Sequence, residues 1–91
     1  MKKEATRAEV FAAIESERRY QDKVWPEGAP SVGDSILLVE EYALKARAAW
    51  ATEAAPEMEA LDIMRKIAGI AVRCMEVHGA PQRAGFEVEA G

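Results

Sequence analysis

One stretch constrains the fold of this chain more than any other: residues 59–78 have the pattern of a single amphipathic helix with clear ends. Pro56 suits the first turn of a helix, where its missing N–H costs nothing. Gly79 suits the position just after the last turn, and Pro81 cannot continue a helix. The pattern therefore predicts a helix from about residue 56 to residue 78.

At about 100° per residue, the side chains of this helix separate into an apolar side and a charged side. The apolar side, which we expect to face the core, comprises Leu61, Met64, Ile67, Ala68, Ala71, Val72 and Met75. The opposite stripe comprises Asp62, Arg65, Lys66, Gly69, Arg73 and Glu76. A glycine in a solvated helix face costs roughly 1 kcal/mol relative to alanine. Gly69 therefore indicates a close approach, either of another helix or of a ligand.

The whole chain of 91 residues is long enough for one domain with a small core. Hydrophobic residues make up 49% of it and aromatics only 7%, and no segment has the alternation of a strand. Such a composition favours close-packed helices. We expect an all-α domain, residues 1–91, with helices at about 7–23, 32–51 and 56–78 and a loosely held tail at 80–91.

The first two helices have recognisable starts and faces. Thr6 and Glu9 have the spacing of a capping box, and Ser31 or Asp34 can cap the second helix. In the first helix we expect an inward side of Val10, Phe11, Ile14, Tyr20 and Gln21 and an outward side of Glu15, Glu17, Arg18, Arg19 and Asp22. The second helix is apolar almost all round, so we expect it to be buried on most sides and the small bundle to be completed by oligomerisation.

Charge and cysteine usage narrow the classes of partner. The net charge of −4 disfavours nucleic acid, whose phosphates dominate such contacts, but leaves room for divalent cations. Cys74 is the only cysteine, so no internal disulfide can form, which fits a reducing cytoplasm. No apolar segment approaches the ~18 residues of a membrane span. Glu4, Arg7 and Glu9 lie where the apolar run of a signal peptide would be, so we expect no signal peptide.

Four carboxylates form the candidate metal site. Glu40 and Glu41 lie midway along the second predicted helix, and Glu59 and Asp62 lie in the first turns of the third. Acids on two antiparallel helices can converge on one divalent cation, and Mg²⁺ prefers oxygen ligands. We therefore predict Glu40, Glu41, Glu59 and Asp62 as Mg²⁺ ligands.

Three cations follow the acids along the third helix. Arg65, Lys66 and Arg73 could hold and neutralise the oxygens of a triphosphate beside a metal. The alternative is that the charges form ordinary surface pairs within helices, such as Asp62 with Arg65 or Lys66, and Glu41 with Lys45. Both interpretations stay open at this stage.

Three segments resemble small MazG-like proteins, many of which are phage-encoded. These segments are Glu15-Ser-Glu-Arg-Arg-Tyr-Gln-Asp-Lys-Val-Trp25, Ile36-Leu-Leu-Val-Glu-Glu-Tyr-Ala-Leu44 and the stretch from Leu61 to Glu76. The resemblance covers about residues 9–79. It implies an all-α fold that is commonly dimeric or tetrameric. It also implies Mg²⁺-dependent hydrolysis of nucleoside triphosphates to a monophosphate and pyrophosphate.

The metal motif of that family is only partly present. Its pattern is EExxE, a spacer and ExxD, and Glu40 and Glu41 match the two leading glutamates. Leu44 stands where the third glutamate belongs, whereas the segment from Glu59 to Asp62 matches ExxD literally. At least one expected carboxylate is therefore missing.

A second register is also open. The aspartate of the family usually precedes a Val/Ile-Ala-Ala-like run directly, and Lys66 occupies that position before Ile67. In this register Ile63 and Lys66 replace the acidic pair, and the metal site is lost. Leu44 and Lys66 are thus the departures from the motif that discriminate between hydrolysis and binding alone.

Three functions remain as hypotheses. The first is a nucleoside triphosphate pyrophosphohydrolase of the MazG type. The second is an inactive relative that binds a nucleotide or nucleotide-like signal through Arg65, Lys66 and Arg73. The third is a helical oligomerisation or protein-binding module with no small ligand. In each case we expect a homodimer or a higher homo-oligomer.

Overall fold

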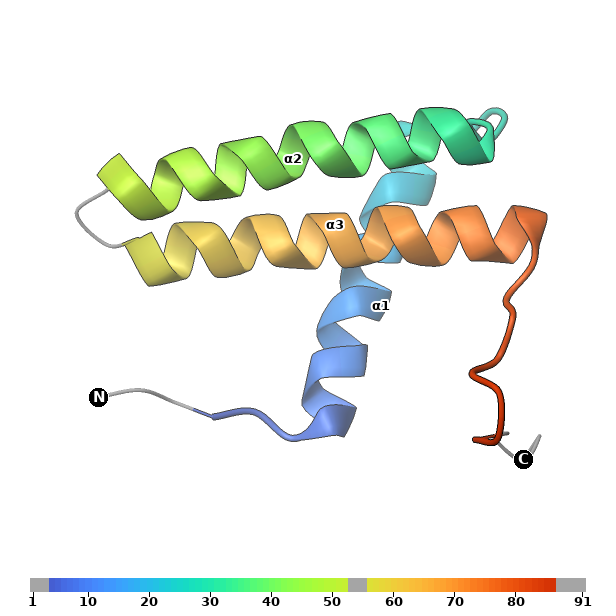
Figure 1. The fold of residues 1–91 in the computed structure, drawn as a ribbon, viewed down its shortest axis with the longest axis horizontal. Helices are drawn as coiled ribbons and strands as arrows, with labels where there is room; N and C mark the ends of the chain where they lie inside the picture. Colours follow the sequence, from blue (N-terminus) through green and yellow to red (C-terminus); the bar gives the residue numbers. More distant parts are fainter. Residues whose placement is uncertain (1–3, 53–55, 87–91) are drawn as a thin grey trace.

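The computed structural model describes residues 4–52 and 56–86. They form three helices, α1 (Arg7–Val24), α2 (Val32–Thr52) and α3 (Pro56–His78), and no strand occurs among them. The predicted all-helical fold is confirmed, and each helix ends within one residue of the predicted position. Figure 1 shows α2 and α3 running side by side in opposite directions, with α1 crossing α3 steeply.

The predicted caps explain where the helices begin and end. The Thr6 N–H donates to Glu9 Oε1 at 2.9 Å, and the Glu9 N–H donates to Thr6 Oγ1 at 3.1 Å, which completes the capping box. Of the two candidates for α2, Ser31 is the cap, because its hydroxyl accepts the Asp34 N–H at 3.1 Å. Gly79 follows α3 with φ of 124°, a conformation that side chains disfavour, so the helix stops there.

The packing of α2 on α3 is apolar. The buried hydrophobic residues among those described are Ala49 on α2 and Ile63 and Ile70 on α3. Ser35, also on α2, is buried with them. Small residues on α2 let the two long helices lie close together over most of their length (Figure 1).

The packing of α1 on α3 depends on Gly69. A Cβ at this position would lie only 2.6 Å from Gln21 Nε2 and 2.8 Å from Glu17 Cγ. Gln21 is 1% exposed, and its Nε2 donates to the backbone oxygen of Lys66 at 3.3 Å. The close approach that Gly69 indicates is therefore that of another helix, α1.

The expected orientation of α3 is wrong for the single chain. Leu61, Met64 and Met75, expected in the core, are 61%, 56% and 41% exposed. The stripe expected opposite the core instead packs on α1, with Gly69 fully inside the contact. Periodicity identified the two sides correctly, but α1 covers the charged one.

The expected faces of α1 also need correction. Glu17 and Arg18 are buried, although we expected them to face outward, and Val10 and Phe11 are exposed. The reason is that α1 contacts α3 only along its C-terminal half, so the N-terminal half extends beyond α3 (Figure 1). Tyr20, expected inward, is exposed as well.

The second helix is less covered than its composition suggests. Only Ser35 and Ala49 of α2 are buried, whereas Ile36, Leu37, Leu44 and Trp50 remain exposed. One chain supplies α2 with a single neighbouring helix, so burial on most sides is not achieved within it.

The remaining segments carry little of the packing. Residues 80–86 are exposed, and the Phe86 N–H closes a turn on the Arg83 oxygen at 3.1 Å. The predicted connection at 53–55 and the end of the tail at 87–91 lie outside the described residues. Among the helices found in the described part of the chain, none has the length and apolar character needed to cross a membrane.

Candidate functional site

A groove between α2 and α3 collects part of the predicted site. Its volume is about 420 Å³, and it lies towards the ends of the two helices that are joined by residues 53–55. The lining residues are Tyr42, Lys45, Ala48, Ala49, Thr52, Glu59, Ile63 and Lys66. Of the residues predicted from sequence, Glu59 and Lys66 are therefore brought together here. Lys45 joins them from α2.

Each of the two lysines is paired with an acid one helical turn before it. Lys45 Nζ lies 3.9 Å from Glu41 Oε1, and Lys66 Nζ lies 3.6 Å from Asp62 Oδ2. Lys45 Nζ also lies 4.8 Å from the centre of the Tyr42 ring, a cation–π contact. Two predicted metal ligands thus neutralise lysines at the edges of the groove.

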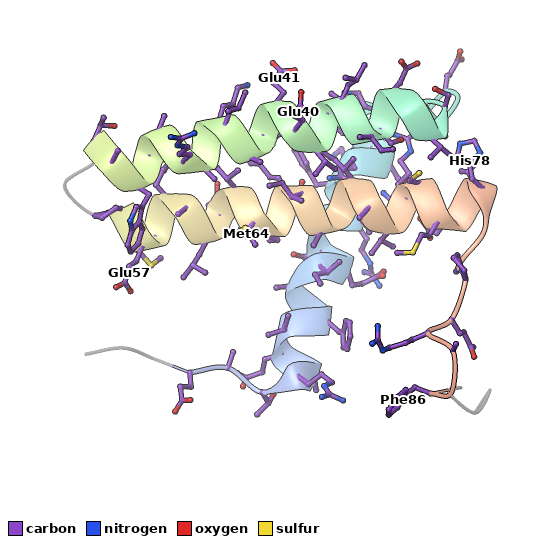
Figure 2. The ribbon with its side chains drawn as sticks, in the orientation of Figure 1. Glu40, Glu41, Glu57, Met64, His78 and Phe86 are labelled. Carbon is purple, nitrogen blue, oxygen red and sulfur yellow. The ribbon has the colours of Figure 1, made fainter. Side chains whose placement is uncertain are left out.

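The four predicted ligands do not gather around one point. Within residues 4–52 and 56–86, no group of three or more His, Cys, Asp or Glu side chains could hold a metal ion. Figure 2 shows Glu40 and Glu41 projecting from α2 on the side away from α3. A single chain therefore does not fit Mg²⁺, which needs convergent carboxylates or substrate oxygens. Coordination by Glu40, Glu41, Glu59 and Asp62 stays a prediction.

Arg65, predicted to bind phosphate, instead joins α3 to α1. Its Nε donates to Glu17 Oε1 at 3.0 Å, and its Nη2 donates to Asp62 Oδ1 at 2.6 Å. The bond to Glu17 raises the pKa of the Arg65 guanidinium, burial opposes this, and the bond to Asp62 adds to the rise. Because Glu17 is only 6% exposed, this ion pair is part of the packing and not of the groove.

A second ion pair across the same contact was not found from sequence. Arg18 Nη2 lies 2.6 Å from Glu76 Oε1 and 2.9 Å from Asp22 Oδ1. Burial acts to lower the pKa of Arg18, but the bonds to Glu76 and Asp22 outweigh it and the pKa is raised. Arg18 and Glu76 are 58 residues apart, and no local pattern links them.

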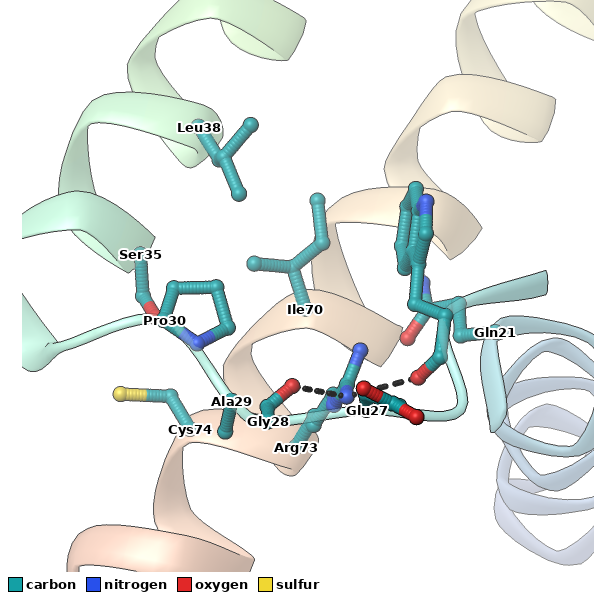
Figure 3. Close-up of a pocket in the computed structure, with 11 residues that line it drawn as sticks. Gln21, Glu27, Gly28, Ala29, Pro30, Ser35, Leu38, Ile70, Arg73 and Cys74 are labelled. Carbon is teal, nitrogen blue, oxygen red and sulfur yellow. Dashed lines mark hydrogen bonds between the residues drawn. The ribbon is translucent and has the colours of Figure 1, made fainter. Parts of the chain in front are cut away.

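Arg73, the third predicted phosphate ligand, holds the loop between α1 and α2. Its Nη2 donates to the backbone oxygens of Trp25 at 2.9 Å and Gly28 at 2.7 Å (Figure 3). His78 Nε2 lies 2.9 Å from the Pro30 oxygen and ties the end of α3 to the same loop. The residues predicted for phosphate binding are thus separated, and only Lys66 reaches the groove.

This loop encloses a second cavity that sequence reasoning missed. Its volume is about 530 Å³. The lining residues are Gln21, Trp25, Glu27, Gly28, Ala29, Pro30, Ser35, Leu38, Ile70, Arg73 and Cys74 (Figure 3). Trp25, at the wall of this cavity, is 42% exposed. The residues that line this cavity are far apart in the sequence, so no local motif indicates it.

Comparisons with protein-family models, with curated proteins and with solved structures find no match to this chain. The function is therefore argued from the geometry of the groove and from the chemistry of its side chains. The resemblance to MazG-like proteins enters only as a proposal.

Proposed function

We propose that this chain is a MazG-like nucleotide-binding protein that holds phosphate groups in the groove between α2 and α3. The observation that carries the proposal is that Lys45 and Lys66, from two different helices, line one groove of about 420 Å³. Ammonium groups form strong charge-assisted bonds with phosphate oxygens. The hydroxyl of Tyr42, in the same lining, is an additional donor, whereas the hydroxyl of Thr52 already donates to the backbone oxygen of Ala48 at 2.7 Å.

Replacing the carboxylate partner of either lysine by a phosphate costs little free energy. Each present ion pair is long, 3.9 Å at Lys45 and 3.6 Å at Lys66, and its two side chains are 40% exposed or more. Exposed pairs of this kind contribute roughly 0.2–1 kcal/mol. A phosphate can therefore replace the carboxylate partner of each lysine without disturbing the packing of α1 on α3.

Binding without metal is favoured over hydrolysis. Glu41 and Asp62, which the resemblance assigns to Mg²⁺, each face an ammonium group instead of one another. In this proposal Lys45 and Lys66 bind the phosphate. Arg65 and Arg73 instead stabilise the fold through their contacts with α1 and with the loop that follows it.

The working form in this proposal is a homodimer or a higher homo-oligomer. One chain leaves large apolar side chains of all three helices exposed, among them Phe11, Trp50 and Leu61. Such a surface is unusual for a monomer and typical of an interface.

Calorimetric titration with a panel of nucleoside triphosphates, monophosphates and pyrophosphate, in EDTA and in Mg²⁺, tests the proposal. We expect binding in EDTA that weakens about tenfold in Lys45→Ala and in Lys66→Ala, because a charged hydrogen bond is worth roughly 1.5–3 kcal/mol. Lys23→Ala, at the end of α1, is the matched control and should bind as wild type does.

Two outcomes would overturn the proposal. Pyrophosphate release that requires Mg²⁺ and disappears in Glu41→Gln would establish the hydrolase. No binding of any nucleotide in either buffer would favour the module without a small ligand.

A further inference from the structure

The third helix has three faces, and only two of them are covered. Successive positions on a helix turn by about 100°, so Ile63 and Ile70, which pack on α2, lie about a third of a turn from Gly69, which packs on α1. The remaining third is apolar; its Leu61, Met64 and Met75 are exposed, and its Ala68 and Val72 are half-buried. We call this the free face of α3 and define it by Leu61, Met64, Ala68, Val72 and Met75.

The free face is symmetric in sequence about Ala68. Leu61 and Met64 precede Ala68 by seven and four residues, and Val72 and Met75 follow it by four and seven. We propose that two copies of this chain pack antiparallel through the free face, with the twofold axis at Ala68. Leu61 then meets the partner subunit's Met75, and Met64 meets the partner subunit's Val72. The alanine at the axis lets the two helices approach closely.

In an interface with twofold symmetry, every contact occurs twice. In such an interface residue i contacts residue j and j contacts i, so the surface has to complement itself. The free face does so, because large side chains at both ends flank a small one in the middle.

Charges do not oppose this pairing. The free face carries no charged residue, and Arg65, Asp62 and Glu76 lie on the face against α1, where their ion pairs remain as they are in the single chain.

The exposed area is sufficient for a stable dimer. The chain exposes 7534 Å². A compact monomer of 10.0 kDa exposes about 5,200 Å². The excess of about 2,300 Å² is spread over the whole chain, of which the free face is one part, and it is larger than the ~800 Å² that each partner buries in a standard interface. The radius of gyration, 14.7 Å against ~12 Å for a compact chain of this length, is consistent with an open single chain.

Sedimentation equilibrium without nucleotide tests this pairing independently of the proposed function. We expect the wild-type chain to associate to at least twice its 10.0 kDa mass, and Leu61→Glu to weaken that association at least 100-fold. Leu44→Glu, on α2, is the matched control because Leu44 is 59% exposed, nearly as much as Leu61 at 61%. It should retain the interface through α3.

Circular dichroism keeps the result interpretable, because each variant must retain the helix content of the wild type. A variant that loses helix is replaced by Met75→Lys, which tests the other end of the same face. A monomeric wild type at 100 μM would overturn the proposal. So would a folded Leu61→Glu variant that associates as tightly as wild type.

Discussion

Two faces of α3 contrast sharply. The face against α1, which we call the covered face, buries Gly69 and pairs Arg65 and Glu76 with Glu17 and Arg18 of α1, whereas Leu61 and Met64 of the free face are exposed. In a single chain the charged face is thus the one that packs on α1, and the large side chains of the apolar face are exposed. The difference teaches that the geometry of a close helix crossing, set here by a glycine, can decide which face a helix turns towards its own chain. The apolar face is then left for a second copy.

The covered face is stable because its polar groups have partners. Arg18, Glu17 and Gln21 form a hydrogen-bonded set with α3, and none of the buried side-chain nitrogen and oxygen atoms in the described residues lacks a partner. Buried polar groups cost much less free energy when they are paired than when they are unpaired. The free face has no such requirement, so any apolar surface of matching shape can cover it.

The largest expected effect concerns charge on the free face. Met75→Lys and Leu61→Glu should each prevent association, because each buries an unpaired charge. The double variant places Glu opposite Lys twice across the twofold axis, so its association should recover at least tenfold over either single variant. Sedimentation at 20 mM and 500 mM salt measures this, and the recovery should fall at the higher salt. Equal dissociation of all three variants would contradict the register.

The next effect concerns the glycine of the covered face. Gly69→Ala should lower the free energy of unfolding by about 1–3 kcal/mol, because its Cβ would lie 2.8 Å from Glu17 Cγ and force α1 away. Gly33→Ala, in α2, is the matched control, since only Ser31 Oγ lies near its Cβ, at 3.9 Å. It should be neutral or add up to ~1 kcal/mol. Urea unfolding of both variants gives the comparison, and equal effects would refute the close crossing.

A smaller effect concerns the ion pair of the covered face. Glu17→Gln should cost roughly 1–3 kcal/mol, because it weakens the buried bonds to Arg65 and Gln21. Glu15→Gln removes a pair with Arg19 on the exposed side of the same helix and should cost ~0.5 kcal/mol or less. Thermal unfolding of the two variants at neutral pH measures the difference. Equal costs would mean that the contact with α3 does not stabilise the helix.

The smallest effect lies at the start of α1, far from both faces. Backbone and side-chain bonds from Thr6 lower the pKa of Glu9 below its ordinary value of 4.5. The capping box therefore stabilises α1 fully above pH 4.5, and that contribution is lost as the pH falls through the lowered pKa. In Thr6→Ala the Glu9 pKa should return towards its ordinary value, which an NMR titration of the Glu9 carboxyl would detect. An unchanged titration would exclude the reciprocal bonds.

Local signals predicted the helices well. The capping box at Thr6, the stop at Gly79 and the close approach at Gly69 all depend on a few neighbouring residues, and the structure contains each of them. The face of α3 that turns inward could not be predicted, because periodicity says which residues share a side and not which neighbour covers it. The burial of Arg18 likewise depends on Glu76, which is distant in sequence.

The candidate site was predicted in part. Glu59 and Lys66 line the groove, but Lys45 was interpreted only as the surface partner of Glu41. Arg73 was assigned to phosphate, whereas it binds backbone oxygens of the loop at Trp25. Backbone acceptors cannot be recognised in a sequence, because every residue carries one.

The most direct test of the free face is a cross-link at its centre. Ala68→Cys in a Cys74→Ser background, oxidised gently in solution, places one thiol from each copy at the twofold axis, and a disulfide needs Cβ atoms ~3.5–4.5 Å apart. Ala51→Cys, exposed near the end of α2, is the control in the same background. The antiparallel pairing predicts rapid formation of a covalent dimer by Ala68→Cys and little by Ala51→Cys. Equal or slower cross-linking of Ala68→Cys would contradict it.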